Sequence, residues 1–443
     1  MPNVLNEHFT VPRLLRYALA PVVMMVFTSV YSVVDGFFVS NFVGKVPFAA
    51  VNLIMPFAMI LGGLGFMTGT GGSALAAKTL GEGRGRTASR YFTDVVCFTL
   101  GLGLMAAVFG VAVMRPLSLF LGATPAMLED CVIYGRILVA FVPAFMLQNV
   151  FQIFFSTAGK PQLGLYVTLA SGLTNIVLDA LFIAVFKWGV PGAAVATGLS
   201  QLMGAVLPVF YFARSNDSLL RFASPARSPR IILRVCTNGV SELMTNISMS
   251  LVSMVYNWQL LRFAGEDGVA AYGVIMYVQF IFVSVFIGYS VAAGPIAAFN
   301  YGAGNRAELR SLLGKSLAMN MAGGLLMMIA AKVLAAPVSF AFTGYDAGLY
   351  ALTTHAFSVF AWSFVLAGVN IYASGFFTAL NNGPVSAVIS FMRTLVFELS
   401  FVLLLPLLFG LEGIWWAICC AEAGSVVVST FFLLRLAPRY GYL

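Results

Sequence analysis

Two aspartates stand inside long apolar segments of this sequence, where an ionised side chain is costly and usually has a function. Asp35 lies in the first such segment and Asp179 lies in the fifth. A spacing of four residues places Asn175 on the same helix face as Asp179, so an amide and a carboxylate converge on one point. Thr197, in the sixth segment, would add a hydroxyl group. This oxygen set suits Na⁺, and two close carboxylates equally suit a proton, so the residues leave both ions open.

The composition is that of a protein whose helices cross a membrane. Of its 443 residues, 60% are hydrophobic and 9% are charged, and the mean hydropathy is +0.95. Twelve apolar segments approach or exceed the roughly 20 residues that a helix needs to span a bilayer, at 14–40, 48–76, 91–113, 130–156, 163–186, 191–213, 232–261, 269–294, 314–336, 352–380, 385–409 and 413–436. The sequence therefore predicts an all-α membrane protein with twelve transmembrane helices and the lipid bilayer as its surroundings.

The two halves of the chain repeat the same landmarks at an offset of about 221 residues. Gly81 corresponds to Gly302, and Asn149 corresponds to Asn370. Because each half holds an even number of spans, the halves share one orientation, and we expect a pseudo-two-fold axis along the membrane normal. The expected parts are an N-lobe with helices 1–6 at residues 1–213, a cytoplasmic linker at 214–230 and a C-lobe with helices 7–12 at 231–443.

The basic residues predict the orientation in the membrane. Most of the 24 Lys and Arg residues fall in the loops on the side of the two termini and of the linker. Short cytoplasmic loops collect such residues, so both termini are expected to be cytoplasmic. This bias also accounts for the net charge of +8, which we therefore do not interpret as nucleic-acid binding. No pattern requires an oligomer, and we expect a monomer.

Enzymatic chemistry has no support in the sequence. The glycine-rich stretch 69–72 lacks the lysine of a phosphate-binding loop and lies in an apolar segment, where small residues serve helix packing. The five cysteines have no metal-ligand spacing. Neither Asp35 nor Asp179 lies in the Gly-x-Gly-Asp loop of an intramembrane aspartyl protease. We therefore expect no catalytic residue, no cofactor and no ATP hydrolysis, so transport would depend on a gradient of Na⁺ or H⁺.

Three motifs in order resemble the multidrug and toxic compound extrusion (MATE) family of bacterial efflux transporters. They are an acid after a proline in the first span (Pro21 and Asp35), Asn-x-x-x-Asp in the fifth, and the glycine-rich start of the sixth at 189–197. The resemblance covers essentially the whole chain. It implies a secondary active antiporter of the bacterial inner membrane that exports organic cations and other amphipathic drugs in exchange for Na⁺ or H⁺ by alternating access.

The resemblance also implies roles for particular residues. The coupling cation would bind in the N-lobe, at Asp35, Asn175, Asp179 and Thr197, with Tyr134 and Asn149 as further contributors. Glu242, in the seventh span, matches an acid that serves a C-lobe cation or the drug in some branches. The tenth span lacks the aspartate that accompanies it in those branches. Glu242 would then be a counter-ion for the substrate or a gating residue.

Other polar and aromatic residues are candidates for substrate contact. Arg393 and Glu398 share the eleventh span at i, i+5, which is a poor same-face spacing on an α-helix, so a lobe-locking contact and a transport role both stay open. The remaining candidates for the space between the lobes are Gln148, Gln152, Tyr256, Asn257, Met276, Tyr277, Gln279 and Asn370.

Two non-antiporter functions remain as alternatives. A lipid-linked saccharide flippase of the same broad fold would need several basic side chains to hold pyrophosphate, and only Arg393 lies within a span. A receptor or scaffold would need neither the internal repeat nor two acids in one lobe.

Overall fold

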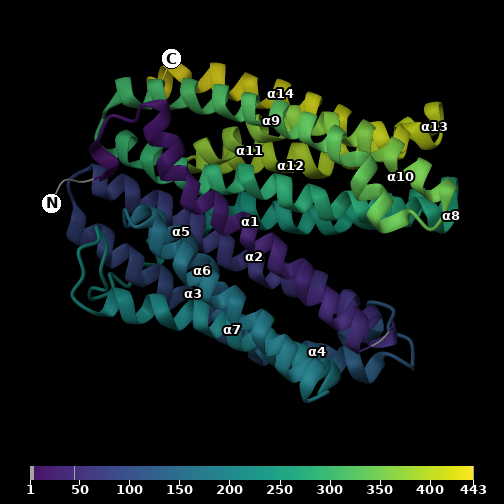
Figure 1. Cartoon of the computed structure of the whole chain (residues 1–443). Helices are drawn as coiled ribbons and strands as arrows, with labels where there is room; N and C mark the ends of the chain where they lie inside the picture. The colour runs from purple at the N-terminus through teal and green to yellow at the C-terminus, as the bar shows by residue number, and fades with distance from the viewer. Residues whose placement is uncertain (1–3, 44, 443) are drawn as a thin grey trace.

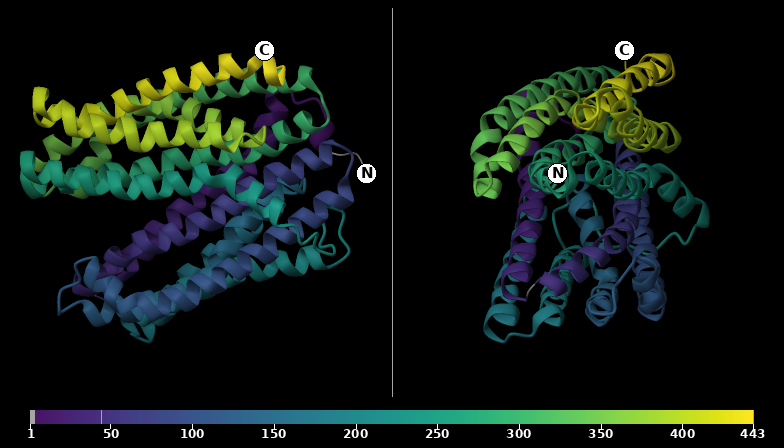
Figure 2. Two further views of the ribbon diagram at one scale, coloured as in Figure 1. Left: turned by 180° about the vertical axis from the view of Figure 1, so that it is seen from behind. Right: turned by 90° about the vertical axis from the view of Figure 1, so that its right-hand side faces the viewer.

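The computed structural model describes residues 4–43 and 45–442, which leaves the first three residues, Gly44 and Leu443 outside the description. All regular elements among the described residues are helices. They form two layers, with α2 to α7 in one and α8 to α14 in the other, and α1 begins beside the second layer and runs diagonally into the first (Figure 1). Figure 2 shows the same two groups from behind and end-on, with the purple to teal helices on one side and the green to yellow helices on the other.

The first half of the chain builds one layer. Its helices are α1 (Val11–Phe42), α2 (Lys45–Gly81), α3 (Gly85–Phe120), α4 (Leu128–Ala140), α5 (Val142–Thr157), α6 (Pro161–Asp179) and α7 (Gly189–Ala213), preceded by the short 3-10 turn η1 (Val4–Asn6). The π-helical segment η2 (Ala180–Val185) extends α6. A bend of 50° separates α4 from α5, because Pro143 near the start of α5 cannot continue the hydrogen bonds of α4. Together these two helices form the predicted span 130–156.

The second half builds the other layer. Its helices are α8 (Pro229–Gly302), α9 (Arg306–Thr343), α10 (Ala347–Phe360), α11 (Phe364–Ala379), α12 (Gly383–Phe391), α13 (Glu398–Phe409) and α14 (Leu411–Tyr440). The short segment η3 (Ala361–Ser363) joins α10 to α11, and the π-helical η4 (Met392–Phe397) joins α12 to α13. Each joined set is one predicted span.

The number of spans agrees with the prediction. Among the described residues ten helices are long and apolar enough to cross a membrane, and the bent α4–α5 pair is an eleventh span. The helix α8 contains two spans, because Gly265 has a left-handed φ of 62° and interrupts it. Twelve transmembrane helices in two six-helix lobes are therefore confirmed. The predicted gap at 262–268 is wrong in extent, since Gly265 alone makes the break.

Glycines bring the two layers into close contact at a seam between α2 and α8. A Cβ atom on Gly71 would meet the carbonyl oxygen of Val235, and one on Gly239 would meet the carbonyl oxygen of Met67. A second contact of this kind joins Gly81 to α8. Side chains larger than hydrogen have no room at these positions, so the backbones themselves form the contact.

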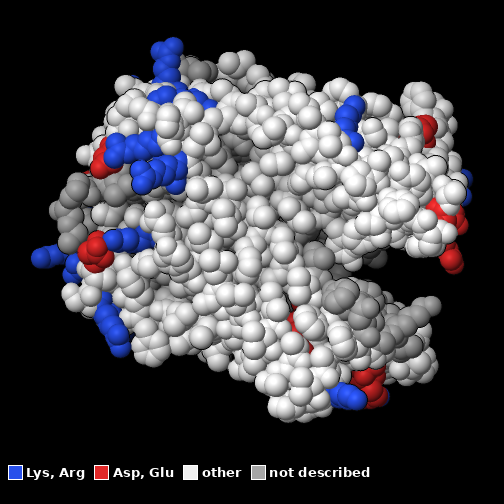
Figure 3. All heavy atoms as spheres, viewed as in Figure 1, with Lys and Arg blue, Asp and Glu red and all other residues white. Residues whose placement is uncertain are grey.

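The two ends of the molecule differ in charge and in shape. Both termini lie at the end where the layers meet (Figure 1). Most Lys and Arg side chains in view gather at this basic end, whereas a notch separates the layers at the far end (Figure 3). The linker hydrogen-bonds to the first layer near the basic end, where the Arg227 amide donates to Asp94 Oδ1 at 3.1 Å and the Leu219 amide donates to the Ala158 carbonyl at 3.2 Å.

The N-terminal segment, residues 5–10, crosses to the second layer and binds α9. The Phe9 amide donates to Glu308 Oε1 at 2.9 Å, and His8 Nδ1 lies 2.6 Å from Glu308 Oε2. Lys315 Nζ donates to the Phe9 carbonyl at 2.7 Å. His8 and Phe9 thus tie the chain just before α1 to the second layer at the basic end.

Candidate functional site

The structure brings the two predicted aspartates together. Asp35 is on α1 and Asp179 is the last residue of α6, and these helices pack against each other. Only 6% of Asp35 and none of Asp179 is exposed. The two carboxyl groups lie within hydrogen-bonding reach of each other, so one can donate to the other when it is protonated. Tyr134 of α4 is close enough to interact electrostatically with both.

Polar atoms without a partner gather around these acids. No hydrogen-bond donor among the described residues reaches Asp35 Oδ1 or either carboxylate oxygen of Asp179. The buried side-chain oxygens of Asn175, Thr197 and Tyr134 also lack partners there. Thr197 is on α7, which packs against both α4 and α6. Each buried polar group left unpaired costs about 1–3 kcal/mol, and oxygens of this kind are the ligands that a small hard cation prefers.

The amides of α5 are engaged elsewhere. Asn149 Nδ2 donates to the Gly62 carbonyl of α2 at 3.3 Å. Gln148 Nε2 donates to Ser171 Oγ at 3.3 Å, and Gln152 Nε2 donates to Thr168 Oγ1 at 3.1 Å. All three amides are buried, so the structure places them as braces between α5 and its neighbours.

One residue near the acids was missed by the sequence reasoning. Tyr31 precedes Asp35 by four residues on the same face of α1. Its hydroxyl lies near Gln148 and interacts electrostatically with Asp35. The i, i+4 spacing of Tyr31 from Asp35 is the sequence feature that could have identified this residue.

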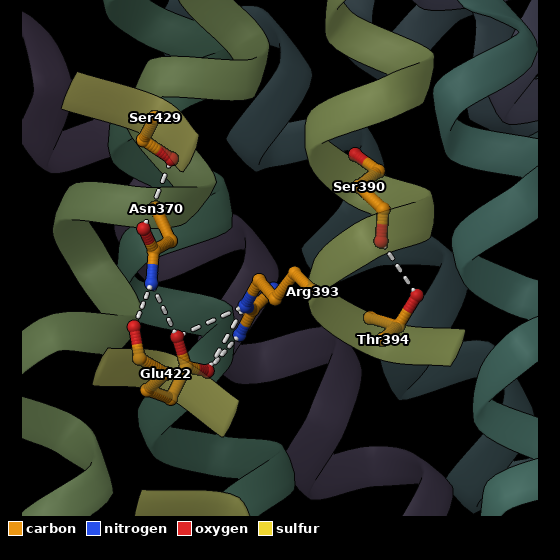
Figure 4. A network of polar contacts seen from close by, with 6 residues as sticks. All are labelled: Asn370, Ser390, Arg393, Thr394, Glu422 and Ser429. Atoms are coloured by element: carbon orange, nitrogen blue, oxygen red, sulfur yellow. Dashed lines mark hydrogen bonds and ion pairs between the residues drawn. The ribbon is translucent and has the colours of Figure 1, made fainter. Parts of the chain in front are cut away.

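A second polar cluster lies in the second layer, and it contains a charge pair (Figure 4). Arg393 Nε and Nη2 donate to Glu422 Oε1 at 2.9 and 2.6 Å. Asn370 Nδ2 donates to Glu422 Oε2 at 2.7 Å, and Ser429 Oγ donates to Asn370 Oδ1 at 3.1 Å. Glu422 of α14, for which the sequence suggested no role, is therefore the hydrogen-bonded partner of Arg393. Because this pair neutralises the guanidinium, the basic group on which a pyrophosphate site would depend is already occupied.

The remaining candidates occupy different surroundings. Glu242 of α8 is half-buried, and its carboxylate has no hydrogen bond or ion pair with the part of the chain that the structure describes. Tyr256 is 1% exposed, inside the second layer. Tyr277 is 46% exposed and stacks on Phe342 at a centroid distance of 6.2 Å. The other three are half-buried residues of α8, namely Asn257, Met276 and Gln279.

Two layers of transmembrane helices that meet at one end and part at the other, with acids buried in one layer, define a membrane transporter. The sequence pattern of the MatE family matches residues 21–181 and 243–404, one stretch in each half of the chain. The chain therefore belongs to this family, the MATE family that the sequence resembles. Its membership of a family of transporters also confirms that it is not an enzyme.

Relatives and solved structures agree with this assignment. The multidrug export protein MepA of Staphylococcus saprophyticus is 22% identical over 438 residues, which cover 98% of this chain and 93% of that protein. MepA of Staphylococcus haemolyticus is 23% identical over 432 residues, with 96% and 94% covered. The outward-facing structure of a multidrug resistance MATE family transporter superposes with a TM-score of 0.93 at 21% identity and covers 99% of this chain and 98% of its own. A MATE crystal structure in complex with MaL6 gives 0.92 at 21% identity, with 98% of each chain covered.

Proposed function

We propose that this protein is a secondary active multidrug efflux antiporter that exports organic cations and other amphipathic drugs in exchange for Na⁺ or H⁺. One observation carries the proposal: two buried carboxyl groups, Asp35 and Asp179, face each other among oxygens that have no partner among the described residues. Two such groups repel each other when both are ionised, so binding of a cation between them is favoured. Asn175, Thr197 and Tyr134 complete the ligand set.

The orientation follows from the charges. The basic end, with both termini, is cytoplasmic, and the notch at the far end opens to the outside of a bacterial inner membrane. The parts that move are the N-lobe at 1–213 and the C-lobe at 231–443, joined by the cytoplasmic linker at 214–230. The protein works as a monomer.

Helix α1 links the cation to the movement of the lobes. Pro21 removes one backbone donor inside α1 and weakens the helix at that point. A Cβ on Gly288 of α8 would lie 2.8 Å from the Pro21 carbonyl oxygen, so α8 packs directly against this weak point. Cation binding at Asp35 therefore rearranges the part of α1 that touches the other lobe. This movement reduces the space for the drug in the outward-open state and favours its release.

The substrate class rests on the relatives and on the side chains available. The MepA proteins of staphylococci are multidrug exporters by name. The chain has 40 Phe, 20 Met and 16 Tyr residues, and aromatic faces attract organic cations while Met repacks around varied shapes. Glu242, half-buried and without a partner among the described residues, is the counter-ion for a cationic drug.

Ethidium efflux from reconstituted proteoliposomes tests the proposal. A Na⁺ gradient and a proton gradient are imposed separately on the parent, Asp35→Asn and Asp179→Asn. Asp217→Asn is the matched control, because it makes the same change at an exposed site in the linker. We expect one gradient to drive efflux in the parent and the control, and neither membrane variant to respond. Equal efflux by the parent and both membrane variants would refute the assigned site, and no efflux by correctly folded parent would refute the antiporter.

A further inference from the structure

An open groove at the basic end lies between the linker and the first turns of α3 and α8. Its volume is about 470 Å³, enough for a small molecule or a headgroup. The residues that line it come from all three segments: Asp94, Cys97, Phe98, Pro225, Arg227, Ser228, Pro229 and Ile232. The apolar segments of these two spans begin at 91 and 232, so the groove lies where the hydrocarbon core of a bilayer meets its headgroups.

Side chains of α3 hold the linker in place beside this groove. The Ala223 amide donates to Thr93 Oγ1 at 3.0 Å, and the Arg227 amide donates to Asp94 Oδ1 at 3.1 Å. Two backbone donors of the linker are thus bound by neighbouring residues of one helix. The groove therefore has a fixed wall on the linker side, although the linker has no regular secondary structure of its own.

The carboxylate of Asp94 is only partly satisfied by the linker. Asp94 is 6% exposed, and its Oδ2 has no hydrogen-bond partner among the described residues. A carboxylate has several acceptor sites on its two oxygens, and the Arg227 amide uses one of them. A buried carboxylate that lacks donors is unfavourable, so a positively charged donor in the groove would be stabilised there.

The other walls of the groove select among positively charged ligands. Arg227 is exposed and also lines the groove, so a ligand with a cationic group alone would be repelled by it, whereas a phosphate would be attracted. Cys97, on the same side of α3, is exposed and with Phe98 makes an apolar wall. An amine, a phosphate and an apolar chain are the three parts of an aminophospholipid. A purely anionic lipid would leave Asp94 without a partner.

We propose that this groove binds a phospholipid whose headgroup carries a primary amine, as that of phosphatidylethanolamine does. The ammonium group is held by Asp94, the phosphate is held by Arg227, and an acyl chain runs along Cys97 and Phe98. The bound lipid contacts α3, the linker and the start of α8 at once. It therefore steadies the junction between the two halves of the chain, and this role is independent of the cation that binds at Asp35.

Counting bound lipids by native mass spectrometry of the delipidated protein tests this proposal without a transport assay. The protein is titrated with phosphatidylethanolamine, phosphatidylcholine and phosphatidylglycerol of the same acyl chains. We expect one molecule of phosphatidylethanolamine to bind more tightly than either of the others, because the choline group cannot donate a hydrogen bond and glycerol has no charge. Phosphoethanolamine, the headgroup without acyl chains, should compete only weakly. Competition at equal concentration would show that the occupant is a soluble amine, and the lipid assignment would be wrong.

Variants of the groove separate the site from general attraction of lipids to the basic end. Asp94→Asn keeps an acceptor for the Arg227 amide and removes the charge, so it should weaken the binding of phosphatidylethanolamine about tenfold and leave that of phosphatidylglycerol unchanged. Asp217→Asn, at an exposed position of the same linker, is the matched control and should bind as the parent does.

Two results would overturn the proposal. Equal binding of phosphatidylethanolamine and phosphatidylglycerol by the parent would mean that the arginines attract lipids without selecting a headgroup. The parent's preference in Asp94→Asn, eluting as a folded protein, would mean that this acid only fixes the linker. If Asp94→Asn does not fold, Cys97→Trp decides, because it fills the groove from an exposed position. Loss of the preferred lipid in Cys97→Trp supports the site, and unchanged binding refutes it.

Discussion

The two lobes solve the problem of a buried acid in opposite ways. In the N-lobe, Asp35 and Asp179 face each other, and no Lys or Arg is paired with them among the described residues. In the C-lobe, Glu422 is held by Arg393 and Asn370. A charge that already has a partner inside the protein does not need a cation from solution, whereas two acids without one do. The comparison indicates that charge balance, more than position in the fold, decides which lobe responds to an ion.

The same comparison predicts opposite effects on stability. Removing one member of a buried ion pair leaves the other charge without compensation, which costs about 3–5 kcal/mol. Removing an acid that has no partner takes away a cost instead. Mutations at the two clusters should therefore move the stability of the protein in opposite directions.

The largest effect is expected at Glu422. Glu422→Ala removes the hydrogen-bonded partner of the buried Arg393 guanidinium, which leaves only Glu398 near it, and should destabilise the protein by up to about 3–5 kcal/mol. The measurement is the apparent Tm in detergent at a fixed heating rate, because unfolding of such proteins is often irreversible. The double variant Arg393→Met/Glu422→Leu should recover most of the loss, and failure to recover would show that the cluster does more than balance charge.

The next effect concerns the seam that both lobes share. Gly71→Leu places a side chain against the Val235 carbonyl and should keep α2 and α8 apart at the basic end. We expect efflux to fall more than about tenfold, since a misfit of this size costs about 1–3 kcal/mol, while cation binding persists in the N-lobe. Spin-label distances between α3 and α9 at the basic end report the separation. Gly101→Leu, at an exposed glycine with no atom within 4 Å of its Cβ position, is the matched control and should change neither quantity.

Loosening of the N-terminal segment, which also joins the two layers at the basic end, should have a smaller effect. Glu308→Gln removes the charge of the carboxylate that accepts a hydrogen bond from the Phe9 amide and contacts His8. Hydrogen bonds to charged groups contribute about 1.5–3 kcal/mol, so the segment should detach more often. Proteolysis of the N-terminal residues in the folded protein should become faster, with no loss of cation binding. Unchanged proteolysis would show that Lys315 and the Leu5 region hold the segment without Glu308.

Mutations of the N-lobe acids should raise the stability of the protein rather than lower it. Asp35→Asn and Asp179→Asn each replace a buried carboxylate with an isosteric neutral group, which is cheaper to bury. We expect the apparent Tm in the absence of Na⁺, measured at the same heating rate, to rise by an amount that corresponds to about 1 kcal/mol, while coupled efflux is lost. A fall as large as that of Glu422→Ala would mean that the N-lobe acids have a structural partner after all, and the comparison would fail.

The smallest effect is expected at the exposed pair of Lys160 and Asp217, which are 2.8 Å apart. The hydrogen bond from Lys160 holds the pKa of Asp217 below its usual value. This contribution is present above the unfolded pKa and is lost only as the pH falls through the lowered folded pKa, in acid. At neutral pH, Lys160→Met should therefore change the efflux rate by less than about twofold and leave the apparent Tm nearly unchanged, because exposed ion pairs contribute little. The measurement is efflux and apparent Tm on the same sample.

Much of the architecture could be predicted from local sequence. Apolar segments of bilayer length identify twelve helices. A backbone segment inside a bilayer must pair its own N–H and C=O groups, and a helix does so within one segment. Asp35 and Asp179 were found by the same reasoning, since acids are rare in such segments. The spacing of Asn175 from Asp179 also predicted a shared helix face, and Tyr31 could have been found in the same way.

The tertiary structure alone decided which distant segments pair with each other. Arg393 and Glu422 are 29 residues apart on different helices, and no spacing links them. The turn between Arg393 and Glu398 is π-helical, which depends on packing rather than on composition. The partners of the amides on α5, namely Gly62 of α2 for Asn149 and residues of α6 for Gln148 and Gln152, also became known only from the packing. Sequence determines which groups must enter the membrane, and packing determines which of them neutralise one another.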